Sequence, residues 1–162
     1  MTEAKPIRVL FVCMGNICRS PSAEAVFRQL VRDRGLESSF VIDSAGTHGF
    51  YHEGSPPDRR SLETARKRGI EMSDLRARPV KSDDFFDFDY ILAMDRPNLY
   101  GLVSAKPEGT QAKIELFLTY APELGVDEVP DPYYGGPQGF DHVLDLIETA
   151  SEALLNDLTS NR

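Results

Sequence analysis

Short apolar stretches alternate along this chain with segments of helical periodicity. Four stretches are rich enough in apolar and β-branched residues to form buried strands, and they lie at residues 6–12, 39–43, 89–94 and 112–118. Helical patterns follow them at residues 20–35, 57–69 and 96–103, and along a final apolar stripe from Val143 to Leu158. This alternation favours a parallel sheet with right-handed crossovers. We therefore expect an α/β fold of three layers, with helices on both faces of a central four-stranded sheet.

The length and charge of the chain narrow the possible functions. With 162 residues, of which 41% are hydrophobic, residues 1–162 fit a single domain. A formal net charge of -8 argues against binding to a nucleic-acid backbone or to an anionic membrane. The N-terminal segment lacks the features of a signal peptide, and no apolar run has the length of a membrane span. We expect a cytoplasmic protein that is a monomer or a weak homodimer.

Both cysteines of the chain, Cys13 and Cys18, lie in one loop between the first strand and the first helix. Ligands of parallel α/β folds bind at the carboxyl ends of the strands, where this loop lies. Its backbone N–H groups and the following helix N-terminus can bind an oxyanion, and Gly15 allows a close backbone approach. Arg19 can bind two phosphate oxygens at once, and the same positive surroundings favour a cysteine thiolate. A thiolate beside an oxyanion site suits phosphoryl transfer.

Three other interpretations of the loop explain less. A Walker-type nucleotide loop would require a Gly-Lys pair, which does not follow here. A zinc site would require about four ligands, and the histidines that remain have no paired spacing: His48, His52 and His142. A merely buried cysteine pair would not explain why Gly15, Asn16, Arg19 and Ser20 share one turn. We expect neither a metal ion nor a cofactor, and we interpret the three histidines as surface or local structural residues.

The loop resembles a known signature. "VCMGNICRSP" (residues 12–21) is similar to the C-x5-R-[ST]-P motif of the low-molecular-weight protein tyrosine phosphatases. Three further blocks agree in order, and they are "IDSAGT" (42–47), "AMDRPN" (93–98) and "VPDPYYGG" (129–136). The resemblance spans essentially the whole chain. It implies a Rossmann-like or flavodoxin-like sheet with strand order 2-1-3-4, and a metal-independent hydrolase that acts on phosphotyrosine in proteins and on small aryl phosphates.

The resemblance also implies three catalytic roles. Cys13 would be the nucleophile that forms a cysteinyl-phosphate, and Arg19 would bind the phosphoryl group. Asp131 would be the general acid for the leaving phenolate and then the base that activates water. A carboxyl group between Pro130 and Pro132 can be held ready for proton transfer. Without the signature, Asp131 would be interpreted as a turn residue in a Pro/Gly-rich loop.

Other residues of the loop would bind the substrate or support the nucleophile. By the resemblance, the backbone of residues 14–18 surrounds the phosphate, and Asn16 together with Ser44 holds the loop in shape. Ser20 would donate a hydrogen bond to the Cys13 thiolate, although it also fits a helix N-cap. The substrate-binding residues of the loop would therefore be Met14, Gly15, Asn16, Ile17, Cys18 and Ser20.

Two positions within the loop carry additional implications of the resemblance. Tyrosine-directed members usually have an apolar branched residue at the position of Ile17, whereas a subset directed to arginine phosphate has threonine. In this family the cysteine at the position of Cys18 can form a disulfide with the nucleophile under peroxide, which protects Cys13 from irreversible oxidation. We therefore expect inactivation by peroxide that thiols reverse.

Aromatic residues would form the walls of the cleft. Tyr133 and Tyr134 resemble the aromatic pair that flanks a phosphotyrosine ring in this family, and flat rings favour stacking. On the opposite wall, residues 48–54 contain no tryptophan and form a segment one residue longer than the family pattern. Either Phe50 or Tyr51 can line the cleft there, and Tyr51 is our candidate for substrate binding.

Rival functions and partners follow from the same residues. Thioredoxin-linked arsenate reduction on this fold needs further resolving cysteines, and residues 19–162 contain none. A phosphotyrosine-binding module without chemistry would lack Cys13 or Asp131, and both are present. The basic residues in segment 59–78 are either a positive rim near the cleft or, as we favour, a solvated helix face. The expected partner is a phosphotyrosine-containing protein, with a tyrosine kinase as one candidate.

Overall fold

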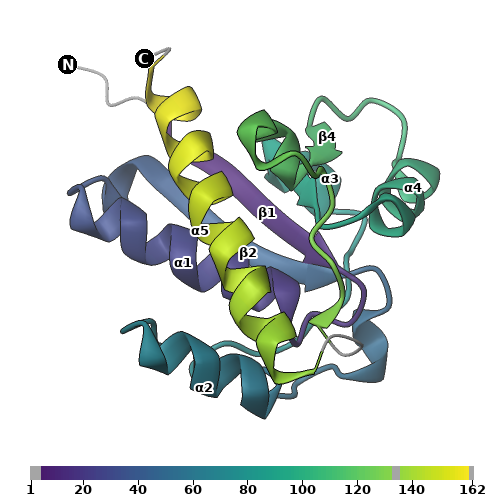
Figure 1. The fold of residues 1–162 in the computed structure, drawn as a ribbon. Helices are drawn as coiled ribbons and strands as arrows, with labels where there is room; N and C mark the ends of the chain where they lie inside the picture. The colour runs from purple at the N-terminus through teal and green to yellow at the C-terminus, as the bar shows by residue number, and fades with distance from the viewer. Residues whose placement is uncertain (1–4, 133–135, 161–162) are drawn as a thin grey trace.

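The four strands form one parallel sheet. The computed structural model describes residues 5–132 and 136–160. Strands β1 (Ile7–Cys13), β2 (Phe40–Gly46), β3 (Tyr90–Ala93) and β4 (Lys113–Leu116) pair in the order β2-β1-β3-β4, and every pair is parallel (Figure 1). The predicted fold class and strand order are therefore confirmed.

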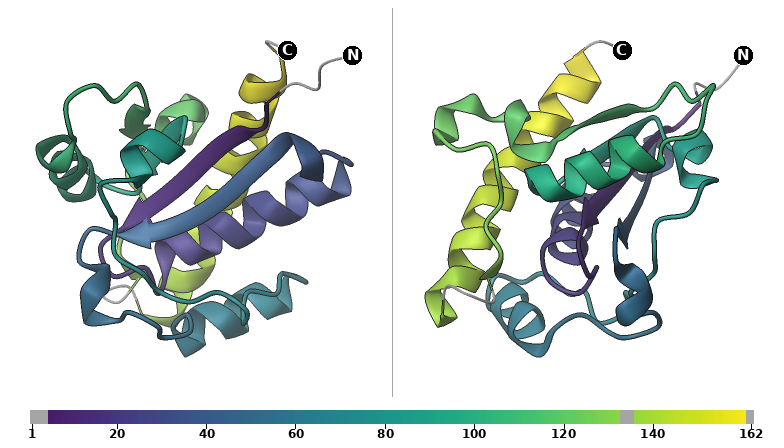
Figure 2. Two further views of the ribbon diagram at one scale, coloured as in Figure 1. Left: turned by 180° about the vertical axis from the view of Figure 1, so that it is seen from behind. Right: turned by 90° about the vertical axis from the view of Figure 1, so that its right-hand side faces the viewer.

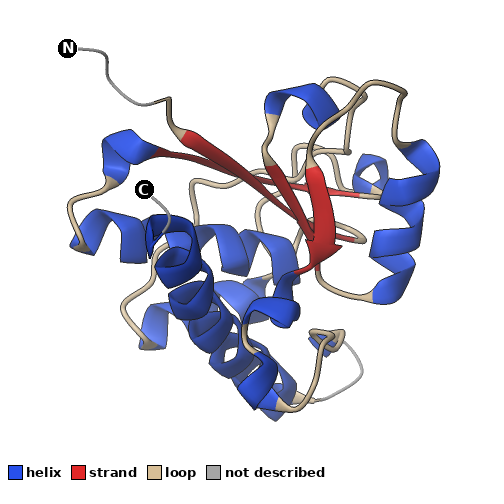
Figure 3. Cartoon of the chain, turned by 90° about the horizontal axis from the view of Figure 1, so that it is seen from above, coloured by secondary structure: helices blue, strands red, loops and turns tan. Residues whose placement is uncertain are grey.

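Helices cover both faces of this sheet, as Figures 2 and 3 show. One face carries α1 (Arg19–Asp33) and α5 (Pro137–Ser160), which pack against each other, and α2 (Arg59–Lys67) packs against α5. The other face carries the short α3 (Asp84–Asp87) and α4 (Arg96–Ala105). Within the described residues, no helix is both long and apolar enough to cross a membrane.

The pleat of β1 divides the core into two parts. Val9 and Phe11 pack with residues of α1 and α5, whereas Leu10 and Val12 pack on the α3 and α4 side. All four side chains are fully buried, because successive residues of a strand point to opposite faces and both faces are covered. A central strand of this kind reads as a continuous apolar run, which explains why its sequence pattern was clear.

Some element boundaries differ from the prediction. Strand β2 continues to Gly46 rather than ending at residue 43, and α5 begins at Pro137 rather than near Val143. Strand β4 ends at Leu116, because residues 117–120 turn into a 3-10 helix in which the buried Phe117 and Leu118 still face the core. An apolar run shows that a segment is buried, but it does not show where the strand ends.

Candidate active site

The loop between β1 and α1 surrounds the Cys13 sulfur with donors. Cys13 is the last residue of β1 and is buried, and α1 begins at Arg19. The Asn16 amide N–H lies 3.3 Å from Cys13 Sγ, and the Ser20 hydroxyl lies 3.0 Å from it. The expectation that Ser20 caps the helix is wrong, because Ser20 lies within the first turn and its hydroxyl faces Cys13. The N-cap position is Cys18, which makes no side-chain capping bond.

The side chain of Asn16 ties this loop to β2. Its Nδ2 donates to Ser20 Oγ at 2.7 Å and to Ser44 Oγ at 3.0 Å. Its backbone has a φ of 59°, in the left-handed region that residues other than glycine rarely adopt. Such a conformation persists only when its surroundings hold it, and these buried hydrogen bonds do so. The structure thus brings together the three polar residues that the resemblance singled out behind the loop.

The backbone at the end of β2 packs closely against the loop between β1 and α1. The amides of Thr47 and His48 donate to the carbonyls of Cys13 and Met14, at 2.9 and 2.8 Å. A Cβ atom at Gly46 would lie 2.5 Å from the Met14 carbonyl oxygen, which no ordinary residue tolerates. Only glycine allows β2 to approach the loop so closely at this position.

One nitrogen of the Arg19 guanidinium group, Nη1, makes two hydrogen bonds within the protein. It donates to Asp95 Oδ2 at 2.6 Å and to the Val129 carbonyl at 2.9 Å. Both bonds use Nη1, so within the described part of the chain Nε and Nη2 are the donors that could bind an anion. Burial alone would lower the pKa of Arg19. The electrostatic interaction with Cys13 and the hydrogen bond and charge of Asp95 outweigh burial and raise that pKa, so that the guanidinium group stays charged. Asp95 also caps α4 by accepting from Asn98 N–H, a role that an aspartate before a helical pattern often has.

A small cavity brings the expected catalytic residues together. Its volume is about 60 Å³, and it is lined by Cys13, Met14, Gly15, Ile17, Cys18, Arg19, His52 and Asp131. This is far below the ~300–1,000 Å³ of pockets for drug-sized ligands, and it suits a single phosphoryl group. The sequence did not indicate His52 as a wall of the site, because no local pattern connects it with the loop.

A larger hollow lies elsewhere on the molecule. It measures about 420 Å³ and is lined by residues near the amino ends of the strands, including Arg8, Asp89 and Lys113. Ligands of parallel sheets bind at the carboxyl ends, and the candidate nucleophile lies there. The smaller cavity is therefore the candidate active site. Among residues 5–132 and 136–160, no three His, Cys, Asp or Glu side chains gather as a metal ion would require.

The aromatic residues of the predicted wall are exposed. Phe50 is 56% exposed and Tyr51 is 73% exposed, and their ring centroids lie 4.3 Å apart. The neighbouring His52 lines the small cavity, but Phe50 and Tyr51 do not. The role of Tyr51 in substrate binding therefore stays a prediction. The predicted opposite wall, Tyr133 and Tyr134, lies outside the described residues.

Cys18 is a free thiol at the side of the cavity. Its side chain is buried, and burial raises the pKa of this thiol to about 12. Cys18 therefore stays protonated at neutral pH, while the hydrogen-bond donors of the loop surround Cys13. The disulfide between the two cysteines under peroxide stays a prediction.

A buried carboxyl group stands behind the loop. Glu24 on α1 is 6% exposed, and its Oε1 accepts a hydrogen bond of 2.7 Å from Ser44 Oγ. Burial raises the pKa of Glu24 to about 7, and the charge of Asp43 adds to this, although the bond from Ser44 opposes it. No sequence pattern indicates that Glu24 is buried, because a glutamate in the second turn of an amphipathic helix usually faces solvent.

Glutamine at position 24 is expected to flatten the pH dependence of stability. In the folded chain Glu24 loses its proton near pH 7, and in the unfolded chain near 4.5. Its contribution to stability is therefore fully present below about pH 4.5 and is lost as the pH rises through about 7. This difference of about 2.5 pH units corresponds to about 3–4 kcal/mol of unfolding free energy, at ~1.4 kcal/mol per pH unit.

Urea unfolding at pH 5 and pH 8 measures this effect. Between these two pH values, the wild type should lose up to about 3 kcal/mol more stability than Glu24→Gln. Glutamine keeps the shape of the side chain and a hydrogen bond with Ser44. Parallel pH profiles for the two proteins would show that Glu24 does not carry the raised pKa.

Fold and site together define a class of protein. A parallel α/β sheet presents, at its carboxyl edge, a buried cysteine in a loop whose Asn16 N–H faces the sulfur, and an arginine and a carboxyl group line the same small cavity. The class is that of parallel α/β proteins with a buried cysteine, an arginine and an aspartate in one cavity at the carboxyl ends of the strands.

Comparison with known proteins gives the family. Residues 8–162 match the model of the low molecular weight phosphotyrosine protein phosphatases. The phosphatase of that name from Schizosaccharomyces pombe is 51% identical over 153 residues, which are 93% of this chain and 96% of that protein. This chain belongs to the low-molecular-weight phosphotyrosine protein phosphatase family, and it is an enzyme that acts on phosphoproteins.

Solved structures agree with this assignment. A protein tyrosine phosphatase from Entamoeba histolytica, solved with Hepes in its active site, is 44% identical, with a TM-score of 0.90 over 96% of this chain and 98% of that one. A Drosophila arginine phosphatase is 33% identical, with a TM-score of 0.88 over 96% of this chain and all of that one. The resemblance seen in the sequence is confirmed.

Proposed function

We propose that this enzyme hydrolyses phosphotyrosine in proteins, and small aryl phosphates, through a cysteinyl-phosphate intermediate. The observation that supports this most is the shared cavity of Cys13, Arg19 and Asp131, residues that come from β1, from α1 and from the segment before α5. Asp131 is more than a hundred residues from Cys13 and Arg19 in the sequence, yet all three groups line one cavity of the size of a phosphoryl group.

In the first step the phosphoryl group moves from the substrate to the enzyme. The Cys13 thiolate attacks phosphorus, and the bond between phosphorus and the phenolic oxygen breaks. The departing oxygen takes a proton from Asp131, because phenolate is a poor leaving group without one. Arg19 and the N–H groups of the loop stabilise the charge on the phosphoryl oxygens in the transition state.

In the second step water releases the phosphate. The Asp131 carboxylate takes a proton from a water molecule, whose oxygen attacks phosphorus. The bond between phosphorus and sulfur breaks, so that inorganic phosphate leaves and the Cys13 thiolate is restored. The hydroxyl of Ser20, 3.0 Å from the sulfur, stabilises this thiolate as the leaving group.

Phosphate release from matched peptides tests the substrate class. The peptides carry phosphotyrosine, phosphoserine or phosphoarginine in one sequence, and EDTA is present throughout. We expect rapid turnover of the phosphotyrosine peptide alone, because Ile17, an apolar branched residue, lines the cavity. Reactions with the Cys13→Ser variant measure the background.

Two outcomes would contradict this proposal. A preference for phosphoarginine would assign the chain the activity named for its Drosophila relative. If the folded wild-type protein hydrolysed none of the peptides, the assignment of catalytic activity would itself be wrong. In that case, binding of the phosphotyrosine peptide without turnover would identify a binding module.

A further inference from the structure

Arg78 lies in a segment that pairs with Gly46, the last residue of β2. Pro79 forms a parallel bridge with Gly46. The Gly46 amide donates to the Arg78 carbonyl at 2.9 Å, and the Val80 amide donates to the Gly46 carbonyl at 3.0 Å. This segment, residues 78–80, is therefore fixed to the same glycine that packs against the phosphate-binding loop.

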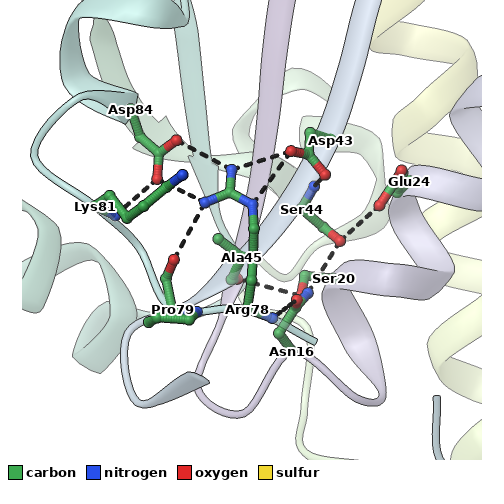
Figure 4. Close-up of polar contacts among 10 residues, drawn as sticks. All are labelled: Asn16, Ser20, Glu24, Asp43, Ser44, Ala45, Arg78, Pro79, Lys81 and Asp84. Carbon is green, nitrogen blue, oxygen red and sulfur yellow. Dashed lines mark hydrogen bonds and ion pairs between the residues drawn. The ribbon is translucent and has the colours of Figure 1, made fainter. Parts of the chain in front are cut away.

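The guanidinium group of Arg78 joins this segment to two carboxylates (Figure 4). It donates to Asp43 Oδ2 from Nε at 3.2 Å and from Nη2 at 3.0 Å. It also donates to both oxygens of Asp84, at 2.9 and 3.0 Å. Asp84 is almost completely buried and accepts a further bond from the Lys81 amide. Arg78 thus connects β2 with α3 and determines where segment 78–80 lies.

The backbone of Arg78 reaches the loop directly. Its N–H donates to Asn16 Oδ1 at 3.0 Å, which sets the orientation of the Asn16 amide. The amide nitrogen of Asn16 must then face the Ser20 and Ser44 hydroxyls. Because Ser20 Oγ accepts this bond, its own hydrogen remains for donation, and Cys13 Sγ, at 3.0 Å, is a nearer acceptor than the Ala45 carbonyl, at 3.4 Å.

The packing around Arg78 leaves little room for this segment to shift. A Cβ atom at Gly49 would lie 2.3 Å from the Arg78 carbonyl oxygen and 2.8 Å from Pro79 Cα. The backbone of the turn after β2 therefore packs directly against segment 78–80. A change in the position of Arg78 would move the donor on which the Asn16 orientation depends.

We propose that Arg78 is a positioning residue of the reaction. Its two ion pairs hold the backbone N–H that orients Asn16, and Asn16 directs the Ser20 hydroxyl onto the Cys13 sulfur. This proposal rests on the role of Cys13 as nucleophile. Arg78 is not among the described residues that line the small cavity, so we assign it an indirect role through Asn16 and Ser20.

A matched pair of arginines tests the proposal. The Arg68 side chain is 23% exposed, as is that of Arg78, and it pairs with Asp141, Asp145 and Glu148 away from the loop. Arg78→Met and Arg68→Met each replace one half-buried guanidinium group by an apolar side chain and so remove its ion pairs. The readouts are the melting temperature, kcat for an aryl phosphate, and the rate at which iodoacetate alkylates Cys13 at pH 6.

Alkylation of Cys13 should separate a positioning role from a structural one. In Arg78→Met we expect alkylation at pH 6 and kcat to fall by about tenfold, because a small misplacement of a supporting donor weakens a preorganised site. Arg68→Met should lower the melting temperature and leave both rates unchanged. Arg78→Lys, which keeps the charge without the planar fork, should lie between wild type and Arg78→Met.

Asp43→Asn provides a second route if Arg78→Met does not fold. It removes the charge of a partner whose side chain is 43% exposed and should slow alkylation by about threefold. Unchanged alkylation and kcat in either variant, with a lowered melting temperature, would overturn the proposal. If wild type itself shows neither turnover nor alkylation of Cys13 at pH 6, the proposed function fails instead.

Discussion

Replacement of Cys13 by serine is expected to lower phosphate release by about 10⁴-fold or more, because the reaction then lacks its nucleophile. A serine hydroxyl at this position fits the space of the thiol, since Asn16 N–H and Ser20 Oγ already surround it. It is not ionised at neutral pH and cannot attack phosphorus at a comparable rate. Phosphate release from a phosphotyrosine peptide measures the loss.

The control for Cys13→Ser is binding. Arg19 and the loop amides remain in place, so the variant should still bind the phosphotyrosine peptide, which calorimetry can measure. Binding without turnover would show that the site is intact and only the chemistry is lost. Residual turnover within tenfold of wild type would contradict a cysteinyl-phosphate mechanism.

Replacement of Asp131 by asparagine is expected to lower the rate of the first step by about 10²–10³-fold for phenyl phosphate. Asparagine keeps the size of the side chain but has no proton to give to the departing oxygen. The loss should shrink as the leaving phenol becomes more acidic, because an acidic phenol leaves without protonation. Pre-steady-state release of a series of phenols measures this dependence.

Asp127→Asn is the matched control. Asp127 lies in the same segment and pairs with Arg96 on the surface, with its side chain 46% exposed. Its replacement removes one negative charge from this segment and should leave the dependence on the phenol unchanged. An equal loss for every phenol in Asp131→Asn would show that Asp131 acts on binding or on structure and not as an acid.

The features of the fold and the site that depend on local sequence patterns could be predicted from the sequence. From Val9 to Val12 the strand β1 is apolar because both of its faces are buried there, and the loop that follows carries its chemistry within seven residues, from Cys13 to Arg19. Fold class, strand order and the place of the loop therefore followed from the order of the elements and from the signature.

The supporting residues could not be predicted in the same way. Asp95 holds Arg19 from 76 positions away along the chain, and Arg78 holds Asn16 from 62 positions away. An aspartate before a helix and an arginine in a loop are common on any surface, so only the tertiary structure shows what they contact. The buried Glu24 and the wall residue His52 were missed for the same reason.

The positions of two glycines in the sequence indicate close backbone packing after the second strand. Gly46 and Gly49 lie where three backbone segments meet, and a side chain at either position would collide with a neighbouring main chain. Two glycines shortly after a predicted strand therefore indicated a close approach of backbones at the end of β2. This signal would have extended β2 beyond residue 43.

The most direct test of the account is the location of the phosphoryl group during turnover. The Asp131→Asn variant should accumulate the intermediate with an aryl phosphate whose phenol is acidic, because the first step then needs no acid and the second lacks its base. The reaction is stopped with denaturant, and mass spectrometry locates the phosphoryl group. The account predicts one phosphoryl group on the sulfur of Cys13. A phosphoryl group on another residue, or none on the enzyme while phosphate is released, would contradict it.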